Sequence, residues 1–155
     1  MTIREATPAD TDGLVAMAAH FLADSPYGAF IPTNPDRLAA LVDTCLRLGT
    51  IIVAETADGC QNALGPHALQ GMFAVVAVEH PFSGARYAEE VAWWVHPRCR
   101  SGTTGPRLLV RGQEWAEAHG LPFLKVGAPL PSTVGAFYER LGYQAVETAY
   151  IKRFT

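Results

Sequence analysis

The stretch EVAWWVHPRCRSGTTGPRLL, residues 90–109, decides the fold of this chain. Its first residues are apolar and aromatic, which is typical of a buried strand. A glycine-rich turn follows, and the last residues open an apolar pattern with helical spacing. A strand, such a turn and a helix start bring backbone N–H groups together at the positive end of a helix dipole. The stretch therefore predicts a turn that can hold a phosphate group.

The rest of the chain repeats this alternation of strand and helix patterns. Helices are expected after Thr7-Pro8-Ala9-Asp10, after Asn34-Pro35, after the turn, and over 132–142, where Gly142 is expected to end the helix in the left-handed conformation. The segment 57–68 is expected to be a loop. Strands are expected over 1–6, 50–55, 69–80, 87–95, 122–128, 143–147 and 149–154, the last two as a hairpin. This order predicts an α/β (α+β) protein with a mixed, mostly antiparallel central sheet, flanked by about four helices.

The composition excludes several classes of protein. The chain has 155 residues, of which 49% are hydrophobic and 17% charged, so a compact domain over 1–155 is expected. The net charge of −3 provides no basic field for nucleic acid. The N-terminus is polar and no apolar run reaches the length of a membrane span, so neither a signal peptide nor a membrane partner is expected.

The cysteines and histidines indicate no metal site. Cys45, Cys60 and Cys99 lie far apart, and the five histidines form no ligand spacing. We therefore expect a reduced, cytoplasmic protein without a bound metal.

Two motifs together resemble the GCN5-related N-acetyltransferase (GNAT) family. The first is Val95-His96-Pro97 followed by Arg100-Ser101-Gly102-Thr103-Thr104-Gly105, which is similar to the family's acetyl-CoA loop. The second is Phe137-Tyr138-Glu139-Arg140-Leu141-Gly142-Tyr143, which resembles the family's aromatic signature. The resemblance covers nearly the whole chain in element order. It implies a GNAT-like fold and an acetyl-CoA-dependent N-acetyltransferase that works by direct transfer in a ternary complex.

The resemblance also implies which residues contact acetyl-CoA. They are Trp94, Val95, Arg100, Ser101, Gly102, Thr103, Thr104, Gly105, Pro106 and Tyr138. The chain departs from the family pattern at Thr103, where a glycine is usual, and at Pro106, which lacks an N–H. The side chain of Thr103 narrows the approach of a diphosphate to the backbone, and Pro106 removes one possible hydrogen-bond donor. By the same resemblance, the N–H of Val95 is expected to stabilise the oxyanion of the reaction.

Two residues are the candidates for proton transfer. The resemblance implies that Tyr138 protonates the leaving thiolate as a general acid, and the alternative is that it only packs in a helix face. It also favours Glu90 as the base for the amine. The alternative is that Glu90 is a solvated strand carboxylate, with a water chain or no dedicated base in its role. Strict alternation along a strand would place Glu90 on the same face as Ala92 and Trp94.

The acceptor side is expected between the first two helices, in SPYGAFIPTN, residues 25–34, with Tyr27, Phe30 and Trp94 as candidate wall residues. The acceptor is expected to be a primary amine of a small molecule or protein, and the resemblance also allows a homodimer. Two alternatives stay open. One is a non-catalytic acyl-CoA-binding module of the same fold. The other is an unrelated nucleotide-binding domain, which the lack of a Gly-Lys-Ser/Thr motif disfavours.

Overall fold

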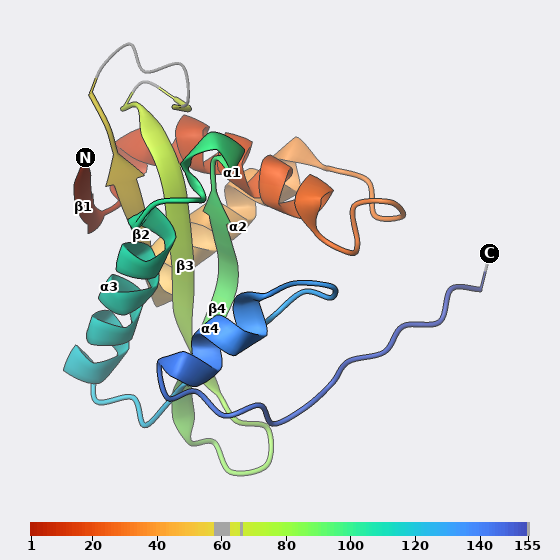
Figure 1. Cartoon of the computed structure of the whole chain (residues 1–155). Coiled ribbons are helices and arrows are strands. Elements are labelled where there is room, and N and C mark those ends of the chain that lie inside the picture. The colour runs from red at the N-terminus through yellow and green to blue at the C-terminus, as the bar shows by residue number, and fades with distance from the viewer. Residues whose placement is uncertain (58–62, 66, 155) are drawn as a thin grey trace.

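The computed structural model describes residues 1–57, 63–65 and 67–154. In these residues a five-stranded sheet has the order β1-β2-β3-β4-β5 (Figure 1). Its first three pairings are antiparallel and β4 pairs with β5 in parallel, so the predicted mixed, mostly antiparallel sheet is confirmed. The strands are β1 (Thr2–Glu5), β2 (Gly49–Glu55), β3 (Leu69–Glu79), β4 (Arg86–Val95) and β5 (Leu124–Lys125).

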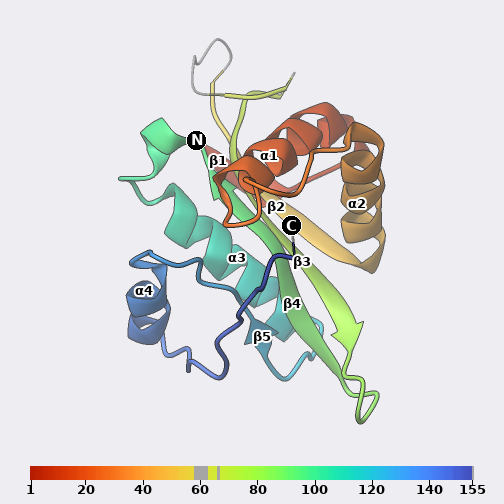
Figure 2. The same ribbon diagram turned by 90° about the vertical axis from the view of Figure 1, so that its right-hand side faces the viewer.

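Four α-helices cover the two faces of the sheet (Figures 1 and 2). One face carries α1 and α2, the other carries α3, and α4 lies on the α3 side of the sheet, beside β4. Their bounds are Thr11–Asp24 for α1, Pro35–Leu48 for α2, Thr104–Ala118 for α3 and Val134–Arg140 for α4, and short 3₁₀ turns occupy Pro8–Asp10 and Pro97–Cys99. The four expected helices are therefore present.

The helix ends follow the chemistry that their sequences predict. The Asp10 carboxylate accepts a hydrogen bond from the Thr7 N–H at 2.8 Å and also binds Arg4 of β1, which ties the start of α1 to the sheet. Hydrogen bonds from Arg4 hold the pKa of Asp10 down to about 2. Asn34 caps α2 by accepting from the Arg37 N–H at 3.1 Å. Gly142 ends α4 with φ +88°, a conformation that favours glycine.

The sheet separates two apolar cores. The first lies under α1 and α2 and includes Leu14, Met17 and Trp94. The second lies under α3 and α4 and includes Phe73, Leu108 and Tyr138. Both faces of β3 are buried because helices cover the sheet on both sides, which explains its near-continuous apolar sequence.

A β-bulge in β4 overturns the alternation expected from the sequence. Ala74 of β3 lies opposite Ala92 but Val75 lies opposite Glu90, so Val91 is an extra residue in β4. Because one extra residue shifts the alternation by one position, Glu90 and Trp94 lie on opposite faces of the sheet. The expectation that they share a face is wrong.

The C-terminal hairpin predicted over 143–147 and 149–154 is also wrong, since residues 143–154 form neither strand nor helix. β5 is only two residues long, so it gives this segment no extended edge to pair with. The segment runs away from the sheet (Figure 1), and its apolar side chains are exposed, Tyr150 and Phe154 each by 90%. The expected loop over 57–68 falls in part on positions 58–62 and 66, and these, with Cys60, lie outside the described residues.

Candidate active site

β4 has an open edge beside α4, and the candidate site lies along it. β5 pairs only with Ala88 and Glu89, and the chain then leaves β4 toward α4 (Figure 2). Within the described residues, no strand pairs with this edge of β4 beyond Glu89. The His96 N–H donates to Gln70 of β3 at 2.8 Å. Because the backbone groups of successive residues point to opposite edges, the N–H of Val95 points to the open edge.

The structure brings together the two residues predicted for proton transfer. The Tyr138 hydroxyl of α4 lies 3.3 Å from a carboxylate oxygen of Glu90 and 3.1 Å from the carbonyl oxygen of Gly127. The same carboxylate oxygen of Glu90 accepts from the Gly127 N–H at 3.3 Å. The bulge makes this possible, because it turns Glu90 toward α4 rather than toward α1.

Burial governs the protonation of both groups. It raises the pKa of Glu90 to about 7, and the hydrogen bonds from Gly127 and Tyr138 offset only part of that rise. Burial also raises the pKa of Tyr138, and the neighbouring carboxylate of Glu90 raises it further. Glu90 therefore titrates near neutral pH, where a general base is most effective, and Tyr138 stays protonated, as a general acid must.

Trp93 belongs to this site although sequence reasoning named its neighbour Trp94 instead. Its ring lies 5.9 Å from the Tyr138 ring and 6.2 Å from the Phe137 ring. Trp94 points to the opposite face, where its indole N–H donates to Asp24 of α1 at 3.0 Å. A signal was present in the sequence, because adjacent strand residues face opposite sides and only one of two neighbouring tryptophans can face α4.

The turn before α3 presents its backbone to solvent. Ser101, Gly102 and Thr103 are exposed, and Thr104 is buried at the first turn of the helix. Pro106 is the third residue of α3, within its first turn, and is partly buried. Gly105 is needed for space, because a Cβ there would lie 3.2 Å from the Trp93 ring. This geometry fits a diphosphate approaching the turn from solvent, with the N–H groups of the first turn of α3 as donors.

The side chain of Arg100 turns away from this turn. Its Nε donates to the Val95 carbonyl at 2.8 Å, and its Nη2 lies 2.6 Å from Asp24. Arg100 thus joins the end of β4 to the end of α1. Burial alone would raise the pKa of Asp24, but the hydrogen bonds from Arg100 and Trp94 outweigh it and leave that pKa lowered.

The predicted acceptor residues lie on the α1 side of β4. Tyr27 is 42% exposed and packs edge-on against Phe30 at 5.9 Å, and the Arg153 guanidinium lies 5.0 Å from the Phe30 ring. Trp94 is buried and stacks on His20 at 5.3 Å. The structure therefore brings Tyr27 and Phe30 together, and it separates Trp94 from Tyr138 by the thickness of the sheet.

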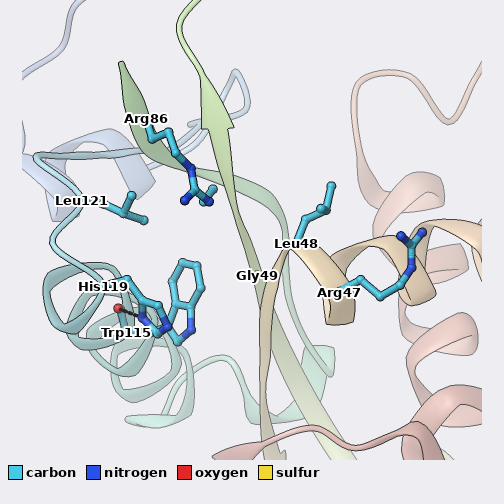
Figure 3. Close-up of a pocket in the computed structure, with 8 residues that line it drawn as sticks. Arg47, Leu48, Gly49, Arg86, Trp115, His119 and Leu121 are labelled. Carbon is cyan, nitrogen blue, oxygen red and sulfur yellow. Dashed lines mark hydrogen bonds between the residues drawn. The ribbon is translucent and has the colours of Figure 1, made fainter. Parts of the chain in front are cut away.

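Two pockets lie outside the group formed by Glu90, Trp93 and Tyr138. One of about 260 Å³ is at the far end of the sheet, where Arg86, Trp115, His119 and Leu121 surround it (Figure 3), and it contains none of the predicted site residues. The other, of about 450 Å³, lies between β1 and α3 and includes Thr103 and Pro106. Among the described residues, no cluster of histidine, cysteine or acidic side chains fits a metal ion. None of the described helices is long and apolar enough to cross a membrane.

Comparison with known proteins identifies the fold. No protein-family model matches the sequence, and a search of curated proteins returns no significant match. Solved structures match along almost the entire chain. A ribosomal-protein-alanine N-acetyltransferase from Brucella melitensis biovar Abortus 2308 is 19% identical, with a TM-score of 0.68 over 99% of this chain and 100% of its own.

Two further structures extend this likeness. A GNAT family acetyltransferase from Staphylococcus aureus is 15% identical, with a TM-score of 0.65 over 99% of this chain and 98% of its own. AAC(6')-Iy, in complex with the bisubstrate analogue CoA-S-monomethyl-acetylneamine, is 14% identical, with a TM-score of 0.73 over 99% of this chain and 97% of its own. The chain has the fold of the GNAT acetyltransferases, which confirms at the level of the fold the family resemblance of its two motifs.

Proposed function

We propose that this protein is an acetyl-CoA-dependent N-acetyltransferase, with residues 1–155 forming one catalytic domain, and that it transfers the acetyl group directly to a primary amine in a ternary complex. The observation that carries the proposal is the pairing of Glu90 and Tyr138 at 3.3 Å on the open edge of β4. One group titrates near pH 7 and the other stays protonated, which are the properties of a base and an acid that act together.

The residues around the open edge fit acetyl-CoA, which would supply an activated acetyl group as a thioester. The backbone of residues 100–106 would hold the diphosphate. The N–H of Val95 would donate to the oxyanion, and Tyr138 would lie at the sulfur. The buried indole nitrogen of Trp93, which has no partner among the described residues, supports a ligand at this place. Trp94 faces the opposite side, so we assign it to the acceptor side with Tyr27 and Phe30, and the acceptor amine would reach Glu90 past the open edge of β4.

Each proton in the proposed reaction has a carrier. Glu90 in its carboxylate form accepts a proton from the ammonium group of the acceptor, and the resulting amine forms the new C–N bond. Tyr138 donates its proton to the sulfur as the C–S bond breaks. The hydrogen bond between the two residues then returns the proton of Glu90 to Tyr138, which restores both groups. The nitrogen of the tetrahedral intermediate still carries one proton more than the product amide. The restored carboxylate of Glu90 accepts this proton and releases it to solvent, so the reaction yields one net proton.

The acceptor is proposed as a class rather than as a compound. One structural neighbour is named for alanine of a ribosomal protein, and another holds an analogue built on acetylneamine. We propose an amine of a small molecule or of a protein. The net charge of −3 supports a cationic acceptor, and a cytoplasmic setting agrees with the spacing of the cysteines.

Calorimetric titration with acetyl-CoA, with ATP and NAD as controls, tests the proposal. Saturable binding of acetyl-CoA alone, followed by thiol release with a panel of primary amines, is the expected result. A folded protein that binds none of the three would overturn the proposal.

A non-catalytic acyl-CoA-binding module is the second candidate function. Thr103 favours it because its side chain narrows the approach to the turn, and Pro106 because it lacks a backbone N–H donor. Tyr138 favours it because only 5% of that residue is exposed. This candidate expects acetyl-CoA binding without turnover for every amine tested. Turnover with any amine would eliminate it.

We also propose a homodimer, supported by the exposed C-terminal segment. Val146, Tyr150 and Phe154 are 79%, 90% and 90% exposed on a segment with the sequence pattern of a strand. Such a segment is stabilised when it pairs with an open sheet edge, and a second copy of the chain offers one. Light scattering should show a dimer for the intact chain and a monomer for a chain that ends at residue 143. An intact chain that stays monomeric would refute the dimer.

A further inference from the structure

Trp93 carries a buried hydrogen-bond donor that this chain does not satisfy. Its Nε1 is enclosed by the protein and has no hydrogen-bond partner in the part of the chain that the structure describes. Buried polar groups in native proteins are nearly always paired, because an unpaired one loses its hydration without compensation. The indole N–H therefore marks a place where an acceptor atom is missing.

The surroundings of the indole are apolar. The rings of Phe73, Phe137 and Tyr138 lie 6.3, 6.2 and 5.9 Å from the Trp93 ring. On the side of the indole nitrogen, a Cβ on Gly105 would lie 3.7 Å from Cε2, the carbon bonded to Nε1. An apolar wall with one directed polar group is the usual lining of a small-molecule site.

The neighbouring tryptophan shows that the strand can satisfy an indole when no ligand is needed. Trp94, on the opposite face, donates to Asp24 at 3.0 Å. Two adjacent residues of the same type thus differ in one respect, since only the one facing α4 is left without an acceptor. This difference makes Trp94 an internal reference for Trp93.

The position of Trp93 along β4 identifies the missing acceptor. Glu90 and Tyr138 lie on one side of it, at the proposed place of the thioester, and the turn over 100–106 lies on the other side, at the proposed place of the diphosphate. The part of acetyl-CoA between its thioester and its diphosphate is the pantetheine arm, which contains two amide carbonyls. We propose that the Nε1–H of Trp93 donates a hydrogen bond to an amide carbonyl of this arm. The inference rests on the proposed function, and it makes Trp93 a cofactor-binding residue.

Indole ¹H–¹⁵N spectra of the wild-type protein test the inference without any measurement of activity. The chain has three tryptophans, so three indole resonances are expected. Saturating acetyl-CoA should move the Trp93 resonance downfield, as a new hydrogen bond does, and should leave the Trp94 resonance near its place. The variant Trp93→Phe assigns the resonance, and Trp94→Phe with Trp115→Phe assigns it by elimination where Trp93→Phe does not fold.

Binding constants give a second readout. Trp93→Phe should raise the Kd of acetyl-CoA about 5- to 10-fold, the usual effect of one lost hydrogen bond. It should leave the Kd of adenosine 3′,5′-bisphosphate, which lacks the pantetheine arm, unchanged. Trp115→Phe, at the far end of α3 beside His119, is the matched control and should change neither constant.

The possible failures are distinguishable. Acetyl-CoA that binds the wild type without moving the Trp93 resonance, and binds Trp93→Phe equally well, would overturn this inference and leave the proposed function standing. If Trp93→Phe weakened the binding of acetyl-CoA and of adenosine 3′,5′-bisphosphate equally, Trp93 would only support the turn. That result would also overturn this inference. A wild-type protein that does not bind acetyl-CoA would overturn both proposals.

Discussion

The hydroxyl of Tyr138 and the carboxylate of Glu90 lie 3.3 Å apart, although 48 positions separate the two residues in the chain. β4 supplies Glu90 and α4 supplies Tyr138, and the carbonyl and N–H of Gly127 hold both groups in place. The candidate base and the candidate acid are therefore one hydrogen-bonded unit. Substitution of either residue should change the behaviour of the other.

Tyr138→Phe should lower kcat about 100-fold, the low end of the range for a general acid, because the leaving thiolate loses its proton donor. The Kd of acetyl-CoA should change little, since the ring and its packing stay. The free energy of unfolding should fall by about 1 kcal/mol for the lost hydrogen bond to Gly127. Thiol release, calorimetry and urea unfolding measure the three quantities. A loss of activity that only follows the loss of folded protein would assign Tyr138 a packing role.

The rate should depend on the ionisation of Glu90. Since burial raises the pKa of this carboxyl to about 7, kcat/KM should rise with pH through about 7 as the base form appears. Glu90→Gln removes the base, so the rising limb near pH 7 should disappear and the remaining rate should be at least tenfold lower. Profiles of kcat/KM from pH 5.5 to 9 for the wild type and Glu90→Gln measure this difference. Glu89→Gln, next along β4, is the matched control, and the same loss in both variants would refute a specific role for Glu90.

The free energy of unfolding should also depend on the ionisation of Glu90, and the pKa of Glu90 gives the direction of this dependence. The pKa of Glu90 is about 7 in the folded chain and 4.5 for the unburied side chain. Between these pH values the native state therefore binds more protons than the unfolded state. The free energy of unfolding should therefore fall as the pH rises from about 4.5 to 7, by at most about 3 kcal/mol at 1.36 kcal/mol per pKa unit. Glu90→Gln should lose less stability over this interval. Parallel urea titrations of the two proteins provide the measurement, and identical pH dependences would contradict the prediction.

Gly105→Ala should weaken acetyl-CoA binding several-fold, because the new Cβ would lie 3.2 Å from the Trp93 ring and must displace it. The usual gain from alanine in a helix, up to about 1 kcal/mol, should be lost to this contact. Gly135→Ala, in α4, is the matched control, since this helical glycine is not among the proposed acetyl-CoA contacts and its nearest new contact is 3.9 Å away. Calorimetry and thermal unfolding of both variants test the contrast. Equal affinities for the two would remove Gly105 and Trp93 from the binding site.

Arg100→Ala should raise the Kd of acetyl-CoA no more than about threefold, because its guanidinium binds Asp24 and the Val95 carbonyl rather than facing the turn. The cost in unfolding free energy should be about 1 kcal/mol or less, since both partners of the ion pair are half exposed. Titrations at low and high salt, with Arg98→Ala for comparison, provide the test. A tenfold loss of affinity that disappears at high salt would show that the guanidinium itself binds phosphate.

The sequence by itself determined the elements and their order. The spacing of apolar residues predicted the four helices and the strands of the sheet. Burial of one face imposes a period of 3.6 residues in a helix and 2 in a strand, whichever element packs against that face. The helix cap Asn34 and the helix-ending Gly142 could also be predicted from the sequence, since they depend on the backbone of a few adjacent residues. The turn before α3 and the aromatic signature of α4 suggested the family by local pattern alone.

Only the tertiary structure decided which side chains meet. The extra residue Val91 in β4 shows no local signal, yet it turns Glu90 toward Tyr138 and leaves Trp93 rather than Trp94 on that face. The hairpin expected after residue 142 did not form. Its sequence pattern indicates residues that favour a strand, but it does not specify which segment that strand pairs with. Pairing of strands is a relation between distant segments, so bulges, open edges and the contacts across them arise only when the whole sheet has assembled.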